Sequence, residues 1–231
     1  MERYSKIFGK NEREIVLLKS LPCSYGKCAF CNYILDNSIN ETEINLINSE
    51  VLREVTGELS VLEVINSASV FELPKETLEN IKITADKKQI KVLYFEVFYS
   101  LINRLDEIRN FFPNQEIRFK VGIETFDDNY RINVFKKNFK ITNFELLNNF
   151  YSCCLLFCTQ GQTKDQILKD IDTALKFFKE ITINIFIEND TEVKRDEELL
   201  KWFLNDIYPK LKEHSNIEIL VDNKDFGVYV Q

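Results

Sequence analysis

Glycine is scarce in this chain of 231 residues, and histidine is almost missing. The 6 glycines stand apart from one another, so neither common type of glycine-rich phosphate loop is present. The single histidine, His214, excludes a metal site built from several histidines and leaves little basis for a Ser-His-Asp triad. The sequence also lacks an apolar stretch of about 18 residues that could span a membrane, and no apolar run typical of a signal peptide follows Met1. We therefore expect a cytoplasmic protein without a membrane partner.

Positive charge is also in short supply. The chain has 30 Lys and Arg residues against 37 Asp and Glu residues, which gives a net charge of −7. A nucleic-acid-binding protein normally presents a basic face, so we do not expect nucleic acid as a partner. Hydrophobic residues make up 45% of the chain and charged residues 29%, as in globular proteins that build a core without disulfides.

Short β-type runs alternate with longer amphipathic runs along the chain. We expect strands at residues 14–20, 61–66, 90–98, 116–124, 151–159, 181–188, 217–221 and 226–230. We expect helices at residues 42–56, 74–86, 100–111, from 127 onward, 164–179 and 195–213. This alternation predicts parallel strands with crossover helices, and its six units are fewer than the eight of a closed barrel. The prediction is one α/β domain over residues 1–231, with an open sheet or a partial barrel.

The run at 181–188 places isoleucines and polar residues alternately. Because side chains alternate between the two faces of a strand, Asn184 and Glu188 should share the face opposite the isoleucines. One interpretation is an edge strand with one solvated face. The other is a polar cavity that Asn184 and Glu188 line.

Three of the 6 cysteines, Cys23, Cys28 and Cys31, form a C-x4-C-x2-C pattern just after the first strand. Such cysteines in the cytoplasm are more often ligands or core residues than disulfides. A structural zinc site would need a fourth ligand, and a ferredoxin-type cluster a fourth cysteine, and neither follows nearby. Three core cysteines without a function are the remaining alternative to the interpretation that we favour, a cubane iron–sulfur cluster with three protein ligands and one open iron. The other cysteines (Cys153, Cys154 and Cys158) are expected in the core, and His214 at the surface.

The loop resembles that of the radical S-adenosylmethionine (SAM) superfamily, whose usual pattern is C-x3-C-x-aromatic-C after the first strand of a partial (βα)6 TIM-like barrel. The match includes the place of the loop, Phe30 before the last cysteine, and Asn32-Tyr33, while the first spacing is one residue longer. The resemblance implies a [4Fe–4S] cluster on the three cysteines, SAM on the open iron and an external electron donor. The reduced cluster would cleave SAM, and the resulting 5′-deoxyadenosyl radical would abstract a hydrogen atom from the substrate.

The resemblance also implies residues that bind SAM, beginning with Phe30 and Tyr33 of the loop. Where the family commonly has Gly-Gly-Glu, this sequence has Asn66-Ser67-Ala68-Ser69, in which Asn66, Ser67 and Ser69 offer polar groups but no carboxylate. Glu96, at the end of the third strand, is the replacement that we expect. Glu124 is implied to contact the ribose hydroxyls, and Arg131 or Lys137 the methionine carboxylate. The alternatives are a solvated strand end for the two glutamates and an ordinary helix surface for the two basic residues.

The predicted core uses the whole chain, so we expect the substrate to bind in the mouth of the barrel. The acidic balance favours a small molecule with donor groups, such as a purine-like base. The candidate substrate contacts are Lys19, Tyr94, Glu96, Asn184, Glu188 and Asp222. In its cysteine loop and its size the chain resembles the queuine lyases, which implies cleavage of queuine to 7-aminomethyl-7-deazaguanine by a carbon–nitrogen lyase. Two alternatives stay open: a radical SAM enzyme that modifies an RNA or a peptide, and a non-catalytic metal-binding module.

Overall fold

The computed structural model of the chain describes residues 2–222, and these form two compact units. The first unit holds residues 2–26 and 33–120, and the second holds residues 27–32 and 121–222. The strand β5 (Glu116–Glu124) belongs to the first unit as far as Lys120 and to the second unit from Val121 onward. A single domain over residues 1–231 stays a prediction.

The first unit is a sheet in the order β1-β2-β3-β4-β5. Its strands are β1 (Tyr4–Ile7), β2 (Arg13–Leu18), β3 (Val61–Asn66), β4 (Val92–Glu96) and the first part of β5. The strand β1 is antiparallel to β2, and the other neighbours are parallel. Parallel neighbours place their carboxyl ends at one edge of the sheet, which is the edge that carries ligand sites in α/β folds.

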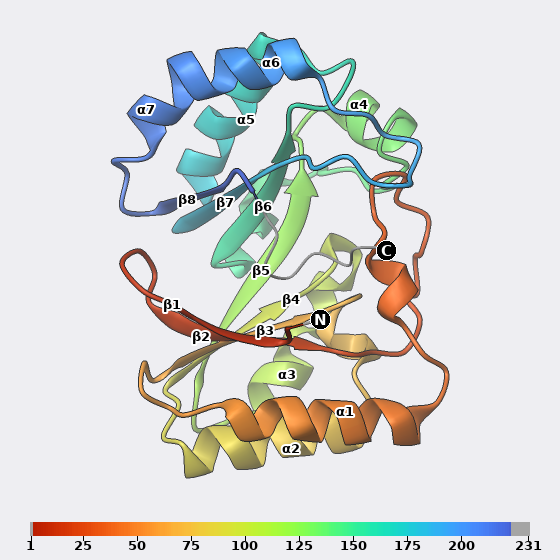
Figure 1. The fold of residues 1–231 in the computed structure, drawn as a ribbon, viewed down its shortest axis with the longest axis vertical. Coiled ribbons are helices and arrows are strands. Elements are labelled where there is room, and N and C mark those ends of the chain that lie inside the picture. The colour runs from red at the N-terminus through yellow and green to blue at the C-terminus, as the bar shows by residue number, and fades with distance from the viewer. Residues whose placement is uncertain (1, 223–231) are drawn as a thin grey trace. The chain divides into compact units, whose positions relative to one another are not determined.

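Three helices cover one face of this sheet: α1 (Glu41–Glu54), α2 (Lys75–Lys87) and α3 (Leu105–Phe111) (Figure 1). Short 3-10 turns lie at Tyr33–Asp36 (η1), Val70–Glu72 (η2) and Tyr99–Arg104 (η3). Val16, Leu62 and Val64 of the strands are fully buried, as are Ile44 of α1 and Ile81 of α2. Burial of an aliphatic side chain of this size stabilises a fold by about 1.5–3 kcal/mol, so these contacts hold helices and sheet together.

The second unit continues in the order β5-β6-β7-β8, with β6 (Ser152–Phe157), β7 (Glu180–Ile185) and β8 (Ile217–Leu220) parallel. Its helices are α4 (Asp128–Asn133), α5 (Lys164–Phe177), α6 (Glu197–Trp202) and α7 (Tyr208–Leu211), with a 3-10 turn η4 (Phe144–Asn149) before β6. The helices α5, α6 and α7 lie on one side of β6–β8 (Figure 1). Thr163 caps α5 by accepting a hydrogen bond from the Gln166 N–H.

The structure confirms the alternation of six strand–helix units and differs from the expectation in four places. The strand β1 was not expected. The helix expected at 100–111 begins with the 3-10 turn η3, and the one expected at 195–213 contains the π-helical turn η5 (Phe203–Ile207) just before Pro209. The strand expected at 181–188 ends at Ile185. The expected strand at 226–230 lies outside the described residues. Within residues 2–222, no helix combines the length and the apolar character that a membrane crossing requires.

Candidate active site

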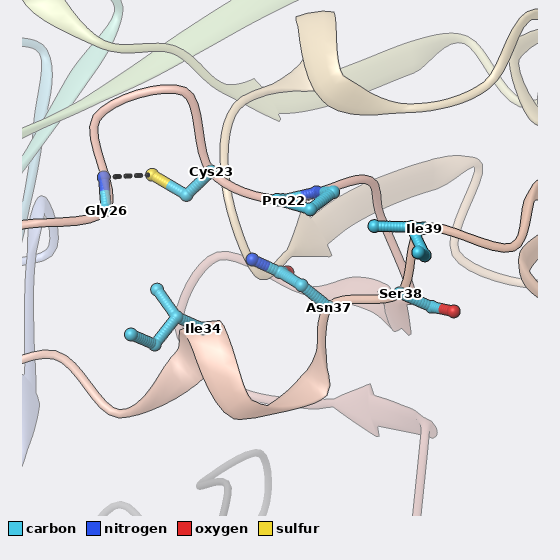
Figure 2. A pocket seen from close by; sticks show the side chains of 7 residues that line it. All are labelled: Pro22, Cys23, Gly26, Ile34, Asn37, Ser38 and Ile39. Atoms are coloured by element: carbon cyan, nitrogen blue, oxygen red, sulfur yellow. Dashed lines mark hydrogen bonds between the residues drawn. The ribbon is translucent and has the colours of Figure 1, made fainter.

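The cysteine loop begins where β2 ends, and its first half belongs to the first unit. The backbone N–H of Gly26 donates a hydrogen bond to Cys23 Sγ at 3.2 Å (Figure 2). Gly26 has a φ of +59°, and a Cβ at this position would lie 3.3 Å from the Cys23 carbonyl oxygen, so glycine suits the turn. This hydrogen bond holds the Cys23 sulfur within the turn.

Cys23 also lines an open pocket of about 520 Å³ in the first unit. The other residues of its wall are Pro22, Gly26, Ile34, Asn37, Ser38 and Ile39 (Figure 2). Asn37 Oδ1 accepts hydrogen bonds from Ser67 Oγ and, at 3.3 Å, from Ser20 Oγ. These bonds connect Ser67, a predicted SAM contact, to the wall of the pocket that Cys23 lines.

The segment after β3 carries the other polar groups predicted to bind SAM. Asn66 Nδ2 donates to the Ser69 carbonyl oxygen at 3.0 Å, while Asn66 Oδ1 is buried and has no hydrogen-bond partner. Ser69 caps η2, and its N–H donates to the Glu72 carboxylate at 3.0 Å. The buried Asn66 oxygen is an unused acceptor, and an ammonium group such as that of SAM would satisfy it.

The second half of the loop, residues 27–32, packs within the second unit. The Ala29 N–H donates to the Phe135 carbonyl oxygen at 2.9 Å, and the rings of Phe30 and Phe135 meet edge to face with centroids 5.1 Å apart. Both loop residues pack against a buried cluster formed by Tyr130, Phe135, Leu156, Phe186 and Val193. Phe30 therefore anchors the segment that carries Cys28 and Cys31. Tyr33 is half-buried at the start of η1, in the first unit.

The thiols of the loop fit a [4Fe–4S] cluster in number and in chemistry. All 6 cysteines lie in the described part of the chain and none forms a disulfide. Cys23, Cys28 and Cys31 are half-buried, so a cluster could reach them. Residues 2–222 hold no metal-binding group of three or more His, Cys, Asp or Glu side chains that is already gathered. Metal centres commonly assemble their ligands as they bind, and three soft thiolates leave one iron of a cubane open.

The remaining cysteines lie on or just after β6. Cys153 and Cys158 are fully buried, as expected, whereas Cys154 is half-buried. Burial raises the pKa of the Cys158 thiol to about 12, so this thiol stays protonated and unreactive.

Glu124 lies at the end of β5, as predicted, and is buried. Its carboxylate accepts a hydrogen bond from Lys137 Nζ at 2.6 Å. Burial acts to lower the pKa of Lys137, but the Glu124 carboxylate and, more weakly, Cys28 and Cys154 raise it, and the net pKa is above its usual value. Lys137 is therefore a buried charged ammonium group that interacts electrostatically with Cys28 of the loop. The alternative of an ordinary helix surface is wrong for this residue.

Arg131 is fully buried and its donors are largely occupied. Its guanidinium donates to the Thr125 carbonyl oxygen at 2.5 Å, to the Phe139 carbonyl oxygen at 3.1 Å and to the Asp128 carboxylate, while Nε has no partner. Burial lowers its pKa from the usual value, and Asp128 opposes this effect. A helix-surface position is excluded for Arg131 as well, since the side chain holds together the segment that follows β5.

The turn after Glu124 is also held by a side chain of α5, Asp170. Glu124 has a φ of +64°, which is uncommon for a residue other than glycine. The Phe126 N–H donates to Asp170 Oδ1 of α5 at 2.7 Å, and Asp170 Oδ2 is buried without a partner. Burial raises the pKa of Asp170 to about 6. Strained backbone of this kind persists where the surroundings determine it, and it concentrates at functional sites.

The predicted substrate contacts of the first unit differ in how accessible they are. Lys19 Nζ lies 3.5 Å from Glu43 and 3.8 Å from Asp36. Tyr94 is buried, and its hydroxyl accepts a hydrogen bond from Arg118 at 2.8 Å. Glu96 ends β4, as predicted, and is half-buried, so of the three its carboxylate is the best placed to meet a ligand at the strand ends.

One predicted substrate contact of the second unit, Glu188, does not lie where it was expected. Asn184 is half-buried within β7. Glu188 is not on the strand face where it was expected, because β7 ends at Ile185; its carboxylate is half-exposed and lies 3.4 Å from Lys194 Nζ. Asp222 is exposed at the end of the described residues, and His214 is exposed, as expected.

Sequence reasoning did not identify two polar residues of the site, Asn37 and Glu72. Glu72 was detectable, because Ser69-x-x-Glu72 is the pattern of a capping box that the structure indeed contains. Asn37 gave no signal, since its contacts with Ser20 and Ser67 join segments far apart in the sequence.

The whole chain is similar to a solved structure of a queuine lyase from Clostridium spiroforme bound to SAM and queuine. The two share 49% sequence identity over 100% of each chain, with a TM-score of 0.94. No family model and no curated protein matches the chain. This similarity confirms the predicted fold class, an α/β partial (βα)6 barrel of the radical SAM type.

Proposed function

The chain belongs to the queuine lyases, a family of radical SAM enzymes, and we propose that it cleaves queuine and releases 7-aminomethyl-7-deazaguanine. The observation that carries this proposal is the identity of 49% across the full length of a queuine lyase whose structure holds SAM and queuine. Agreement over the entire chain supports a shared substrate as well as a shared fold, since the substrate contacts of such a barrel come from several strand ends.

The thiols of Cys23, Cys28 and Cys31 would hold the [4Fe–4S] cluster. When bound, the cluster and SAM supply the reductive cleavage of SAM and the removal of a hydrogen atom from the substrate. The Gly26 N–H holds the Cys23 sulfur by a hydrogen bond, and the contacts of Ala29 and Phe30 fix the segment around the other two ligands.

For SAM itself we propose contacts with Asn66, Glu124 and Lys137. The unpartnered Asn66 Oδ1 would accept from the amino group, with Ser67 and Ser69 ordering the same segment. Glu124 would accept from the ribose hydroxyls, and Lys137 would attract the methionine carboxylate. Lys137 suits this role better than Arg131, because the guanidinium of Arg131 already serves three acceptors of its own segment.

For queuine we propose Glu96 and Asn184 as the principal contacts, because both are half-buried at or near strand ends. A carboxylate accepts hydrogen bonds from the N–H edge of a purine-like base, and an amide can both donate and accept. The other four contacts stay predictions. Tyr94 is buried, Lys19 and Glu188 form ion pairs, and Asp222 is exposed.

The remaining features of the proposal concern partners and location. The reaction consumes an electron, so an external electron donor is required. We keep a single domain, a cytoplasmic location and the absence of nucleic-acid and membrane partners as predictions from the acidic composition and the reduced thiols.

The test is anaerobic reconstitution with iron and sulfide, followed by incubation with SAM, dithionite and queuine. We expect about four iron atoms per chain, and 7-aminomethyl-7-deazaguanine together with 5′-deoxyadenosine in the product analysis by mass spectrometry. Cys31→Ala should lose the cluster and both products. Cys153→Ala is the control, because it removes a buried thiol outside the loop, near the start of β6, and should keep both.

Two other outcomes would reject parts of the proposal. Cleavage of SAM without the deazaguanine product would reject queuine as the substrate and favour a radical SAM enzyme that modifies an RNA or a peptide. Binding of one zinc ion without iron–sulfur absorbance would reject the radical enzyme in favour of a metal-binding module.

A further inference from the structure

The loop after β7 contacts the cysteine loop through one side chain, Asn189. Asn189 Nδ2 donates a hydrogen bond to the Phe30 carbonyl oxygen at 3.1 Å, although the two residues are 159 positions apart. Asn189 Oδ1 accepts from the Thr191 N–H at 3.0 Å and from Thr191 Oγ1 at 2.6 Å. The two Thr191 donors fix which end of the amide is oxygen, so the NH2 group faces the cysteine loop.

The bond to Phe30 acts on a single peptide plane. The carbonyl of Phe30 and the N–H of Cys31 belong to the same peptide group, which is planar and rigid. The Cys31 N–H donates to the Cys28 carbonyl oxygen at 3.2 Å. This plane is therefore held at its oxygen by Asn189 and at its nitrogen by Cys28, and it carries the Cα of Cys31 directly.

We propose that Asn189 is a positioning residue for the iron–sulfur cluster, which rests on the function proposed above. By fixing the Phe30–Cys31 peptide, it sets the direction in which the Cys31 side chain leaves the backbone relative to Cys28. The Ala29–Phe135 hydrogen bond and the Phe30–Phe135 ring contact hold the same segment one residue earlier. Asn189 adds the hydrogen bond at the oxygen of the Phe30–Cys31 plane, whose nitrogen side is held by Cys28.

The discriminating variant is Asn189→Asp. Aspartate has nearly the same shape and still accepts from Thr191, but it replaces the NH2 donor with an anionic oxygen that faces the Phe30 carbonyl. Asn129→Asp is the matched control, because Asn129 is exposed on α4 in the same unit and its oxygen, which accepts from Asn133, is retained. Asn189→Ala, which adds no charge, is the second variant.

Each reconstituted protein is treated with an iron chelator, and the rate of iron release is measured. We expect iron release to be about fivefold faster from both Asn189 variants, which is the factor that one ordinary hydrogen bond is worth, and to keep the wild-type rate in Asn129→Asp. The electron paramagnetic resonance spectrum of the reduced cluster should also shift in both Asn189 variants. The melting temperature of the iron-free chain should stay close to that of the wild type, which separates positioning from loss of fold.

Wild-type release rates and spectra in both Asn189 variants would overturn the role of Asn189 while leaving the enzyme assignment intact. A wild-type chain that takes up no cluster would overturn the role of Asn189 and the proposed function together. If Asn189→Asp does not fold, Asn189→Ala alone decides by the same two measurements.

Discussion

Replacing Gly122 with alanine tests whether the Glu124–Lys137 pair is built as the structure has it. Gly122 lies in β5 with an ordinary backbone conformation, so alanine is allowed there by its φ. The obstacle is space. A Cβ on residue 122 would lie 2.6 Å from Glu124 Oε1 and 2.6 Å from Lys137 Nζ, the two atoms that form the pair.

The size of the effect follows from these distances. Ordinary contact begins at 3.4 Å, so each atom would have to retreat by about 0.8 Å. Both side chains are almost fully buried, so they have little room to move. Overpacking of a filled interior typically costs about 1–3 kcal/mol. We therefore expect Gly122→Ala to lower the free energy of unfolding by about 2 kcal/mol and the melting temperature by about 4–8 °C.

The assay combines thermal unfolding of the iron-free chain with calorimetric titration of SAM into the reconstituted enzyme. If Glu124 and Lys137 contact SAM, their displacement should weaken its binding by about tenfold or more, as expected for the loss of a charge-assisted hydrogen bond. The same substitution in a Lys137→Met background supplies the control. There the methyl group no longer meets the ammonium, so alanine should cost at least about 1 kcal/mol less. An equal cost in both backgrounds, or wild-type stability and SAM affinity in Gly122→Ala, would refute this geometry.

Three further predictions concern buried titratable groups. Burial opposes ionisation of Glu63, but Lys120 and Arg13 outweigh it and lower its pKa from 4.5 to about 2. The ionised Glu63 therefore contributes about 3 kcal/mol to the free energy of unfolding above pH 4.5, and this contribution is lost as the pH falls toward 2. In Glu63→Gln the urea midpoint should depend less on pH over that range. For Asp170 the pH dependence runs the other way. Its pKa is raised from 3.8 to about 6, so the protein has its full stability below pH 3.8 and loses stability as the pH rises through 6. Asp170→Asn should then unfold at a higher urea concentration than the wild type at pH 8, but not at pH 4. Iodoacetamide should alkylate the loop cysteines of the iron-free chain far faster than Cys158, which peptide mass mapping would check.

The alternation of strands and helices was predictable because its signals are local. Apolar periodicity, the cap at Thr163 and the proline before α2 each act within a few residues, and the structure contains all of them. The strand β1 gave no such signal, since its four residues gain their order by pairing with β2. The π-helical turn before Pro209 does have a local signal, because proline cannot supply the N–H that a continuous helix requires.

The candidate site was predictable only where one segment carries it. The cysteines and the strand-end glutamates, Glu96 and Glu124, could be found because each belongs to a recognisable local pattern. Contacts between distant segments carry no such pattern: Arg13, Glu63 and Lys120, for example, come from three strands and meet only in the folded sheet. The same holds for Asn189 and Phe30. A pattern in the sequence names the residue that does chemistry, whereas its supports lie on other elements.

The backbone of Glu124 shows why such supports are needed. A left-handed conformation costs a residue with a Cβ about 1–2 kcal/mol, and glycine would avoid this cost at position 124. Glycine, however, would remove the carboxylate that Lys137 binds. The conformation is instead held by groups on other elements: Arg131 bonds the Thr125 carbonyl, and Asp170 bonds the Phe126 N–H. The buried side chains of Arg131 and Asp170 thus stabilise the turn that places the Glu124 carboxylate, which gives both a structural role without contact to a ligand.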